Sequence, residues 1–207
     1  MEGNGGVLHP VGRTLPSRVA MARRTPPFTT ENVAYHAARL LLLIDRCGSP
    51  RRGAKPPGIK GRTLLAKLDF FLRYPTYLLR AARMAEPRTK AAVGVLDALR
   101  DPAPTAEAPM VRYKYGPWDH SYYVVLAYLI GKGLIEVHIE GRTEVFRVTE
   151  RGREVADAVA TESPYADLAM RADAVRVIFS GFTGNQLKTY IYERFPEVVA
   201  RDYDETI

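Results

Sequence analysis

Residues 110–154 have the sequence MVRYKYGPWDHSYYVVLAYLIGKGLIEVHIEGRTEVFRVTERGRE, in which strand-like, turn-forming and helix-like stretches follow one another. Met110–Lys114 predicts a short strand, and Gly116-Pro117 predicts a turn because neither residue favours regular structure. Pro117 also suits the first turn of a helix, where its missing amide costs nothing. A helix is therefore expected over residues 118–131, ending at the glycines at 131 and 133.

Residues 134–148 alternate apolar and polar side chains on either side of a turn at 140–143. Leu134–Ile139 and Glu144–Val148 are expected to pair as a hairpin, because alternation places one set of side chains on each face of a strand. Thr149 followed by Glu150 is typical of a helix N-terminus, where the hydroxyl caps free amides and the carboxylate suits the positive end of the helix dipole. Another helix is predicted after the hairpin.

Helix, glycine turn, hairpin and capped helix is the element order of a winged helix. Two upstream stretches, 31–46 and 62–73, have apolar residues at helical spacing and are expected to supply its supporting helices. Further helices are predicted at 164–179 and 183–195, the second opening on the capping box Thr183-Gly-Asn-Gln186. The predicted fold class is α+β and mostly helical: a winged helix-turn-helix with extra N- and C-terminal helices. An unrelated α+β arrangement with a surface hairpin stays open.

Glycine and proline mark the expected domain organisation. Residues 1–27 contain so many of both that a disordered N-terminal extension is predicted, and translation starting at Met21 instead of Met1 is an open expectation. Residues 28–161 are expected to form the winged-helix-like domain, interrupted by a basic loop at 48–61 and a proline-rich linker at 101–109. Residues 162–207 are expected to form a C-terminal helical extension.

The composition is that of an ordinary globular protein. The 207 residues are 46% hydrophobic and 26% charged, which excludes a disordered chain. Cys47 is the only cysteine, so a disulfide scaffold is excluded and a reducing compartment is favoured. No apolar run approaches the roughly 18 residues that span a bilayer. A cytoplasmic protein without a membrane partner is therefore expected.

The net charge of +7 is unevenly distributed along the chain. Residues 46–90 carry a net +10, whereas residues 136–207 carry a net −5. The basic run lies on a loop and the start of a helix, which is typical of a site that follows nucleic-acid phosphates without reading bases. A solvated loop and a docking site for an acidic protein are equally open. The candidate phosphate contacts are Arg51, Arg52, Lys55, Lys60, Arg62 and Lys67.

Catalytic residues are not evident from the spacing of reactive side chains. The four histidines do not fall at metal-ligand spacing with one another or with Cys47. Asp119-His120-Ser121 contains the residue types of a hydrolase triad, but consecutive helical positions point about 100° apart and form no relay. We therefore expect a protein that is not an enzyme and that uses neither a metal nor a cofactor.

The helix predicted at 118–131 is poorly suited to reading DNA. A recognition helix reads base edges with Arg, Lys, Asn or Gln near its N-terminal end, where this chain has Asp119, His120 and Ser121. Its aromatic residues favour a protein contact instead, because aromatic side chains are enriched in interface cores. That half of them fill the protein's own core stays open. The candidate partner-binding residues are Tyr115, Trp118, Tyr122, Tyr123 and Tyr128, with Leu187, Tyr190 and Phe195 from the helix at 183–195.

Three segments carry a family resemblance: Gly61–Pro75 (GRTLLAKLDFFLRYP), Tyr113–Trp118 (YKYGPW) and Leu187–Pro196 (LKTYIYERFP). They resemble the small middle component of ABC-three-component systems, bacterial anti-phage or anti-plasmid assemblies of the Lamassu kind. The resemblance implies a non-catalytic accessory subunit that bridges an SMC-like ABC ATPase and an effector, with sequence-nonspecific DNA contact as an additional expectation. The basic loop at 48–61 departs from the family pattern.

Two other functions stay open on the sequence. A winged-helix transcriptional regulator would use the helix at 118–131 and the hairpin to bind DNA. An antitoxin-like protein would neutralise a toxin encoded beside it, because a Tyr-Gly-Pro turn before a helix also occurs in such proteins.

Overall fold

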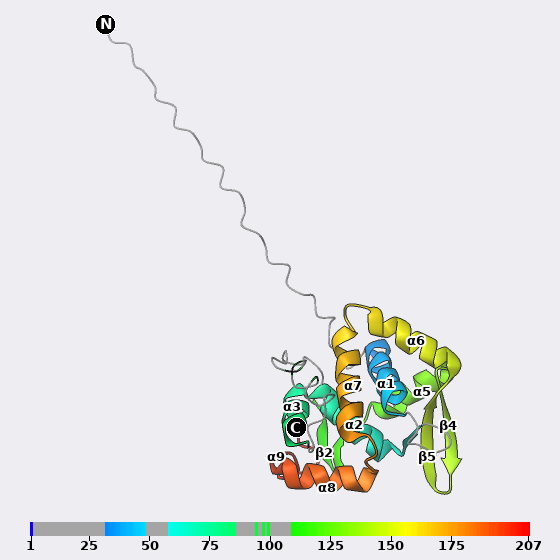
Figure 1. Ribbon diagram of the computed structural model, residues 1–207, viewed down its shortest axis with the longest axis vertical. Coiled ribbons are helices and arrows are strands. Elements are labelled where there is room, and N and C mark those ends of the chain that lie inside the picture. The colour runs from blue at the N-terminus through cyan, green and yellow to red at the C-terminus, as the bar shows by residue number, and fades with distance from the viewer. Residues whose placement is uncertain (2–31, 49–57, 86–93, 95–96, 98, 100–108) are drawn as a thin grey trace.

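The computed structural model describes residues 1, 32–48, 58–85, 94, 97, 99 and 109–207. The chain is mixed α+β and mostly helical, with small antiparallel sheets (Figure 1), as the sequence predicts at this level. The elements are α1 (Val33–Cys47), β1 (Ile59–Lys60), α2 (Arg62–Arg73), α3 (Pro75–Met84), β2 (Val111–Tyr113), β3 (Gly116–Trp118), α5 (Tyr122–Gly131), β4 (Ile135–Glu140), β5 (Thr143–Val148), α6 (Glu150–Thr161), α7 (Ala166–Phe179), α8 (Gly184–Arg194) and α9 (Pro196–Val199).

The larger sheet has the strand order β1-β5-β4 and is antiparallel throughout. Phe146 of β5 lies opposite Val137 of β4 on one side and Ile59 of β1 on the other. The predicted hairpin is confirmed, and Gly141 in its turn has a φ of 63°, a conformation that glycine adopts without steric cost. β1 follows the basic loop, of which residues 49–57 lie outside the described part of the chain.

A second antiparallel pair, β2 with β3, corrects the predicted start of the next helix. Pro117 and Trp118 do not open that helix but form β3, in which Trp118 lies opposite Val111. The chain reverses at Lys114 and Tyr115, and Gly116 at the start of β3 has a φ of 112°, which is unfavourable for any side chain that has a Cβ. α5 begins only at Tyr122. Just before it, the Asp119 carboxylate accepts a hydrogen bond from the Ser121 backbone N–H at 2.7 Å.

Helices α1 and α2 form the centre of the core. All ten residues from Tyr35 to Ile44 are buried, and so are all nine from Leu65 to Arg73. The apolar spacing of each helix predicts one buried stripe, but Figure 1 shows α1 surrounded by α5, α6 and α7. Over these stretches both helices are buried on every side, and their charged side chains are buried as well.

The C-terminal helices are part of the same core. Phe179 of α7 and Phe195, which follows α8, pack against Phe71 of α2 with ring centres 4.2 and 5.7 Å apart. The predicted capping box at Thr183 and Gln186 is present. The last residues lie along β2, where the Ile207 N–H donates to the Met110 carbonyl at 2.9 Å. The extension predicted at 162–207 is therefore packed into the helical body.

The described helices are all too short or too polar to cross a bilayer. The N-terminal extension at 1–27 and most of the linker at 101–109 lie outside the described residues.

Candidate functional site

Among the described helices, α5 exposes the most large apolar side chains. Tyr123 and Val124 are 56% and 59% exposed, and Tyr128 and Ile130 are exposed beside them. The opposite side of the helix, with Val125 and Leu129, is buried in the core. Such a helix is apolar on both sides, but only one side is buried in the core. The exposed apolar side is typically covered by a partner protein. We call Tyr123, Val124, Tyr128 and Ile130 the α5 face.

Four of the predicted partner-binding residues are not on the surface. Trp118, Tyr122, Leu187 and Phe195 are buried, so the prediction that they contact a partner is wrong. They fill the protein's own core: Tyr122 and Leu187 lie on the inward sides of α5 and α8, Trp118 lies in β3, and Phe195 follows α8. Tyr190 is half-buried against Phe179, Phe182 and Phe195, whereas Tyr115, Tyr123 and Tyr128 are exposed.

The three predicted phosphate contacts that the structure describes do not form a free basic patch. Lys60 forms an ion pair with Glu140 at 2.6 Å, and Arg62 forms one with Glu144 at 2.5 Å, so glutamates of the hairpin oppose both cations. Lys67 is buried, which corrects its assignment to a phosphate-binding surface, and its Nζ donates to the Thr63 carbonyl at 2.9 Å. Arg51, Arg52 and Lys55 lie outside the described residues.

Cations and the hairpin border the α5 face. The guanidinium carbon of Arg62 lies 4.9 Å from the centre of the Tyr123 ring while the same side chain pairs with Glu144 of β5. At the other end of the helix, Lys132 Nζ lies 5.6 Å from the centre of the Tyr128 ring. The face thus combines an apolar centre with a charged rim, which is the usual anatomy of a protein interface.

A buried polar cluster fixes α5 against the two central helices. The Asp69 carboxylate accepts hydrogen bonds from Arg39 Nε at 2.9 Å, Arg73 Nε at 3.0 Å and the Tyr122 hydroxyl at 2.7 Å. Arg73 also bonds to Asp119, directly before α5. These five residues, which we call the Asp69 cluster, come from α1, α2, α5 and the loop before it. Their bonds set the direction in which the α5 face points.

The ionisation of the Asp69 cluster agrees with its geometry. Burial alone would raise the pKa of Asp69, but Arg39, Arg73 and the Tyr122 hydroxyl together hold it below its ordinary value. Burial would likewise raise the pKa of Asp119, but Arg73 and Ser121 lower it to about 2. Burial raises the pKa of Tyr122 well above its ordinary value, so its hydroxyl stays protonated and donates.

Sequence reasoning did not find this cluster, although a signal for it exists. Arg39 interrupts the apolar run from Ala37 to Ile44, and Asp69 interrupts the run from Leu68 to Leu72. A charge inside an apolar run, repeated on two core helices with opposite sign, indicates a buried ion pair.

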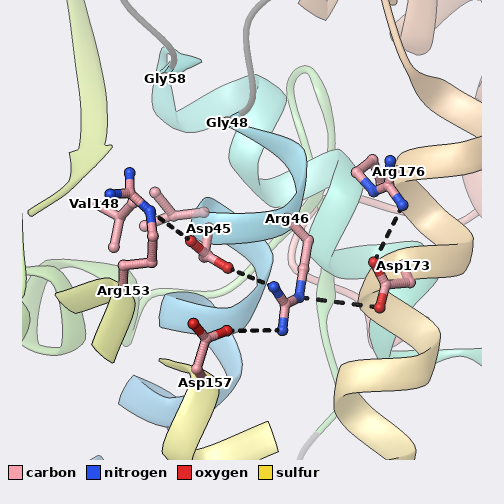
Figure 2. A pocket seen from close by; sticks show the side chains of 10 residues that line it. Asp45, Arg46, Gly48, Gly58, Val148, Arg153, Asp157, Asp173 and Arg176 are labelled. Atoms are coloured by element: carbon pink, nitrogen blue, oxygen red, sulfur yellow. Dashed lines mark hydrogen bonds and ion pairs between the residues drawn. The ribbon is translucent and has the colours of Figure 1, made fainter. Parts of the chain in front are cut away.

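A pocket of about 370 Å³ lies where α1 ends, between α6 and α7 (Figure 2). Three arginines and three aspartates alternate around it. Arg46 contacts Asp45 at 3.0 Å, Asp157 at 3.4 Å and Asp173 at 4.0 Å. We call this group the Asp45 pocket; its charged residues are Asp45, Arg46, Arg153, Asp157, Asp173 and Arg176.

The charged side chains of the Asp45 pocket are paired with one another. Arg153 lies 3.8 Å from Asp45, and Arg176 lies 3.4 Å from Asp173, so each guanidinium already faces a carboxylate. Burial raises the pKa of Asp45 against the lowering effect of Arg46. The neighbouring Cys47 thiol is not a ready nucleophile, because burial raises its pKa to about 12.

The described residues contain no group of three or more His, Cys, Asp or Glu side chains that could hold a metal ion. Asp119-His120-Ser121 is not a relay either, since Asp119 bonds to Arg73 and to the Ser121 backbone. The candidate functional site is the α5 face, an exposed apolar helix surface whose position is fixed by the Asp69 cluster.

Comparison of the chain with protein-family models, with curated proteins and with solved structures finds no match.

Proposed function

We propose that residues 33–161 form a winged helix into which α3 and the β2–β3 pair are inserted. The order α1, β1, α2, α5, β4, β5 supports this, because a short strand lies between the first two helices and a hairpin follows the third. The sheet order β1-β5-β4, in which the first strand pairs with the last, also fits a winged helix. On this assignment α5 occupies the position of the recognition helix.

We propose that α5 binds a protein and that the chain is a non-catalytic adaptor. The observation that supports this is the α5 face itself: its exposed side chains are tyrosine, valine and isoleucine, none of which reads a base edge as Arg or Asn does. Each large apolar residue that a partner covers would contribute roughly 1.5–3 kcal/mol to binding. The Asp69 cluster below the face keeps it in one orientation, which lowers the entropy lost on binding.

The resemblance of Gly61–Pro75, Tyr113–Trp118 and Leu187–Pro196 to the middle component of ABC-three-component systems supports one particular partner. We propose that the chain bridges an SMC-like ABC ATPase and an effector in a cytoplasmic anti-phage or anti-plasmid complex. These segments correspond to α2, the β2–β3 pair and α8. These three segments do not contain the residues of the α5 face, to which the partner is proposed to bind.

Recovery of the tagged full chain from its native host tests the proposal. Mass spectrometry is expected to identify a large coiled-coil ATPase with the wild-type chain and at least 10-fold less of it with Val124→Glu. Ile139→Glu is the matched control, because Ile139 is also an exposed apolar residue but lies on β4. Its recovery of the ATPase should be unchanged.

Three results would contradict the proposal in different ways. Recovery of the chain alone would contradict an adaptor. Recovery of an unrelated partner that Val124→Glu loses would keep α5 as the interface but contradict the defence complex. A sequence-specific footprint of the purified chain on its own promoter would favour the transcriptional regulator instead.

A further inference from the structure

Exposed tyrosines alternate with cations on a surface that the α5 face does not include. The surface is formed by the β2–β3 turn, α8 and the residues that follow α9, and Figure 1 shows β2, α8 and the C-terminus at one end of the molecule. Tyr115 and Tyr203 are 46% and 66% exposed, and Tyr192 lies half-buried between them. We call the set Arg112, Lys114, Tyr115, Lys188, Tyr192 and Tyr203 the tyrosine surface.

The contacts make the tyrosine surface continuous. Lys188 Nζ lies 5.8 Å from the centre of the Tyr115 ring and 5.3 Å from that of Tyr192. The guanidinium carbon of Arg112 lies 5.6 Å from the Tyr192 ring and 5.0 Å from the Tyr203 ring. The Tyr192 hydroxyl donates to the Lys114 carbonyl at 3.4 Å, which joins α8 to the turn. Ring, cation, ring, cation and ring therefore follow one another across three segments.

The lysines of this surface have no acidic partner among the described residues. Within the described residues, no carboxylate lies within ion-pair distance of Lys114 or Lys188, whereas Lys60 and Arg62 each pair with a glutamate. Arg112 is only 8% exposed, donates to the Tyr113 carbonyl, and has a buried Nε without an acceptor in that same part of the chain.

Two of the carboxylates near this surface have contacts of their own. Glu205 accepts from Arg201 at 2.9 Å, and Asp204 lies 3.8 Å from His120. Lys67 lies behind the turn, beside Gly116. Burial and the charge of Lys188 lower the pKa of Lys67 to about 8.

Aromatic faces between unpaired cations are the arrangement that binds single strands. Bases stack on the rings whatever their identity, and the cations follow the phosphates. A duplex would not offer its base faces, and an acidic peptide would use the cations but not the rings. We propose that the tyrosine surface binds single-stranded nucleic acid without sequence preference, at a site separate from the α5 face.

Fluorescence anisotropy with the full chain and a labelled 20-nucleotide oligo-dT tests this proposal. Phosphate contacts from Lys114 and Lys188 predict a log–log salt slope of about −1.4, so the association constant should fall roughly 7-fold between 50 and 200 mM salt. Tyr115→Ala should weaken binding about 5-fold or more by removing a stacking ring, and Tyr115→Phe should not. Lys188→Ala should weaken binding and flatten the salt slope by about 0.7.

Matched controls and competitors distinguish the alternatives. Tyr123→Ala and Lys132→Ala remove an exposed ring and an exposed cation from the α5 face and should leave oligo-dT binding unchanged. Oligo-rU measured in parallel shows whether DNA or RNA binds more tightly, and binding of either supports the site. Absence of binding at 50 mM salt would overturn the proposal. So would displacement by poly-glutamate together with an unaffected Tyr115→Ala, which would indicate an acidic protein as the partner.

Discussion

The Asp69 cluster and the Asp45 pocket contain the same chemical groups in opposite surroundings. In both, an arginine of α1 pairs with an aspartate of another helix, Arg39 with Asp69 of α2 at 2.9 Å and Arg46 with Asp157 of α6 at 3.4 Å. The Asp69 side chain is fully buried, whereas the Asp157 side chain in the pocket is 61% exposed. Water therefore competes for the Arg46–Asp157 pair and not for the pairs of the cluster, while Asp45, with a side chain only 7% exposed, is the buried carboxylate of the pocket.

This difference shows that burial and the number of partners determine how much an ion pair of this kind contributes to stability. Breaking a buried pair leaves an uncompensated charge and costs about 3–5 kcal/mol, while an exposed pair contributes about 0–1 kcal/mol. The pKa shifts have opposite directions in the two regions. Arginines and a hydroxyl hold the pKa of Asp69 low despite burial, whereas burial raises that of Asp45.

Asp69→Asn should produce the largest effect, because it removes the charge that Arg39 and Arg73 share at the centre of the core. The free energy of unfolding should fall by about 3–5 kcal/mol in urea titrations followed by circular dichroism. That is a large part of the 5–15 kcal/mol typical of a domain, so a chain already unfolded without urea also agrees with the expectation. A loss below 1 kcal/mol would show that the cluster is not the structural centre.

Acid should weaken the cluster before it weakens the rest of the core. Asp119 has its pKa lowered to about 2 in the folded state from an ordinary value of 3.8, so its stabilisation is present above about pH 4 and lost between about pH 4 and pH 2. At 1.36 kcal/mol per pKa unit the effect is about 2 kcal/mol. Because Asp45 has a raised pKa, its contribution has the opposite sign, and protonation there favours the folded state.

The comparison of wild type with Asp119→Asn isolates this effect from the other carboxylates. The variant should be less stable by about 2 kcal/mol at pH 7, and the gap should close by pH 2. A gap that stays constant with pH would mean that Arg73 and Asp119 do not interact as charges.

Tyr122→Phe should cost about 1–2 kcal/mol, since it removes one hydrogen bond to a charged acceptor and keeps the ring in the core. The urea midpoint is the measurement, and the slope should not change. Tyr123→Phe is the matched control because Tyr123 is the exposed neighbour on α5, and its effect should be below about 0.5 kcal/mol. Equal effects for the two variants would contradict the hydrogen bond to Asp69.

The sequence predicts the elements of this fold better than their burial. Alternation with a glycine turn predicts the β4–β5 hairpin, and Thr183 with Gln186 predicts the start of α8, because these signals are local. The burial of Arg39 and Asp69 is not predictable from period alone, because periodicity identifies an apolar stripe but not how many elements surround a helix. The strand conformation of Trp118 is not predictable from local sequence for a related reason: it depends on pairing with Val111 across a turn.

The same limit applies to the candidate sites. Aromatic residues near residues 115–128 predict an interface, but which of them point outward depends on tertiary packing, which separates Tyr123 from the buried Tyr122. The charge of residues 46–90 likewise predicts a basic surface. Only the register of the hairpin places Glu140 and Glu144 opposite Lys60 and Arg62.

The smallest effect is expected in the Asp45 pocket. A double-mutant cycle of Arg46→Ala and Asp157→Ala should give a coupling energy of about 0–1 kcal/mol, because Asp157 is largely solvated and Arg46 keeps Asp45 and Asp173 as partners. The coupling should also decrease at 1 M salt, where the screening length is about 3 Å. A salt-independent coupling above 2 kcal/mol would place this pocket with the Asp69 cluster as a structural clamp, and burial would then not be what separates the two regions.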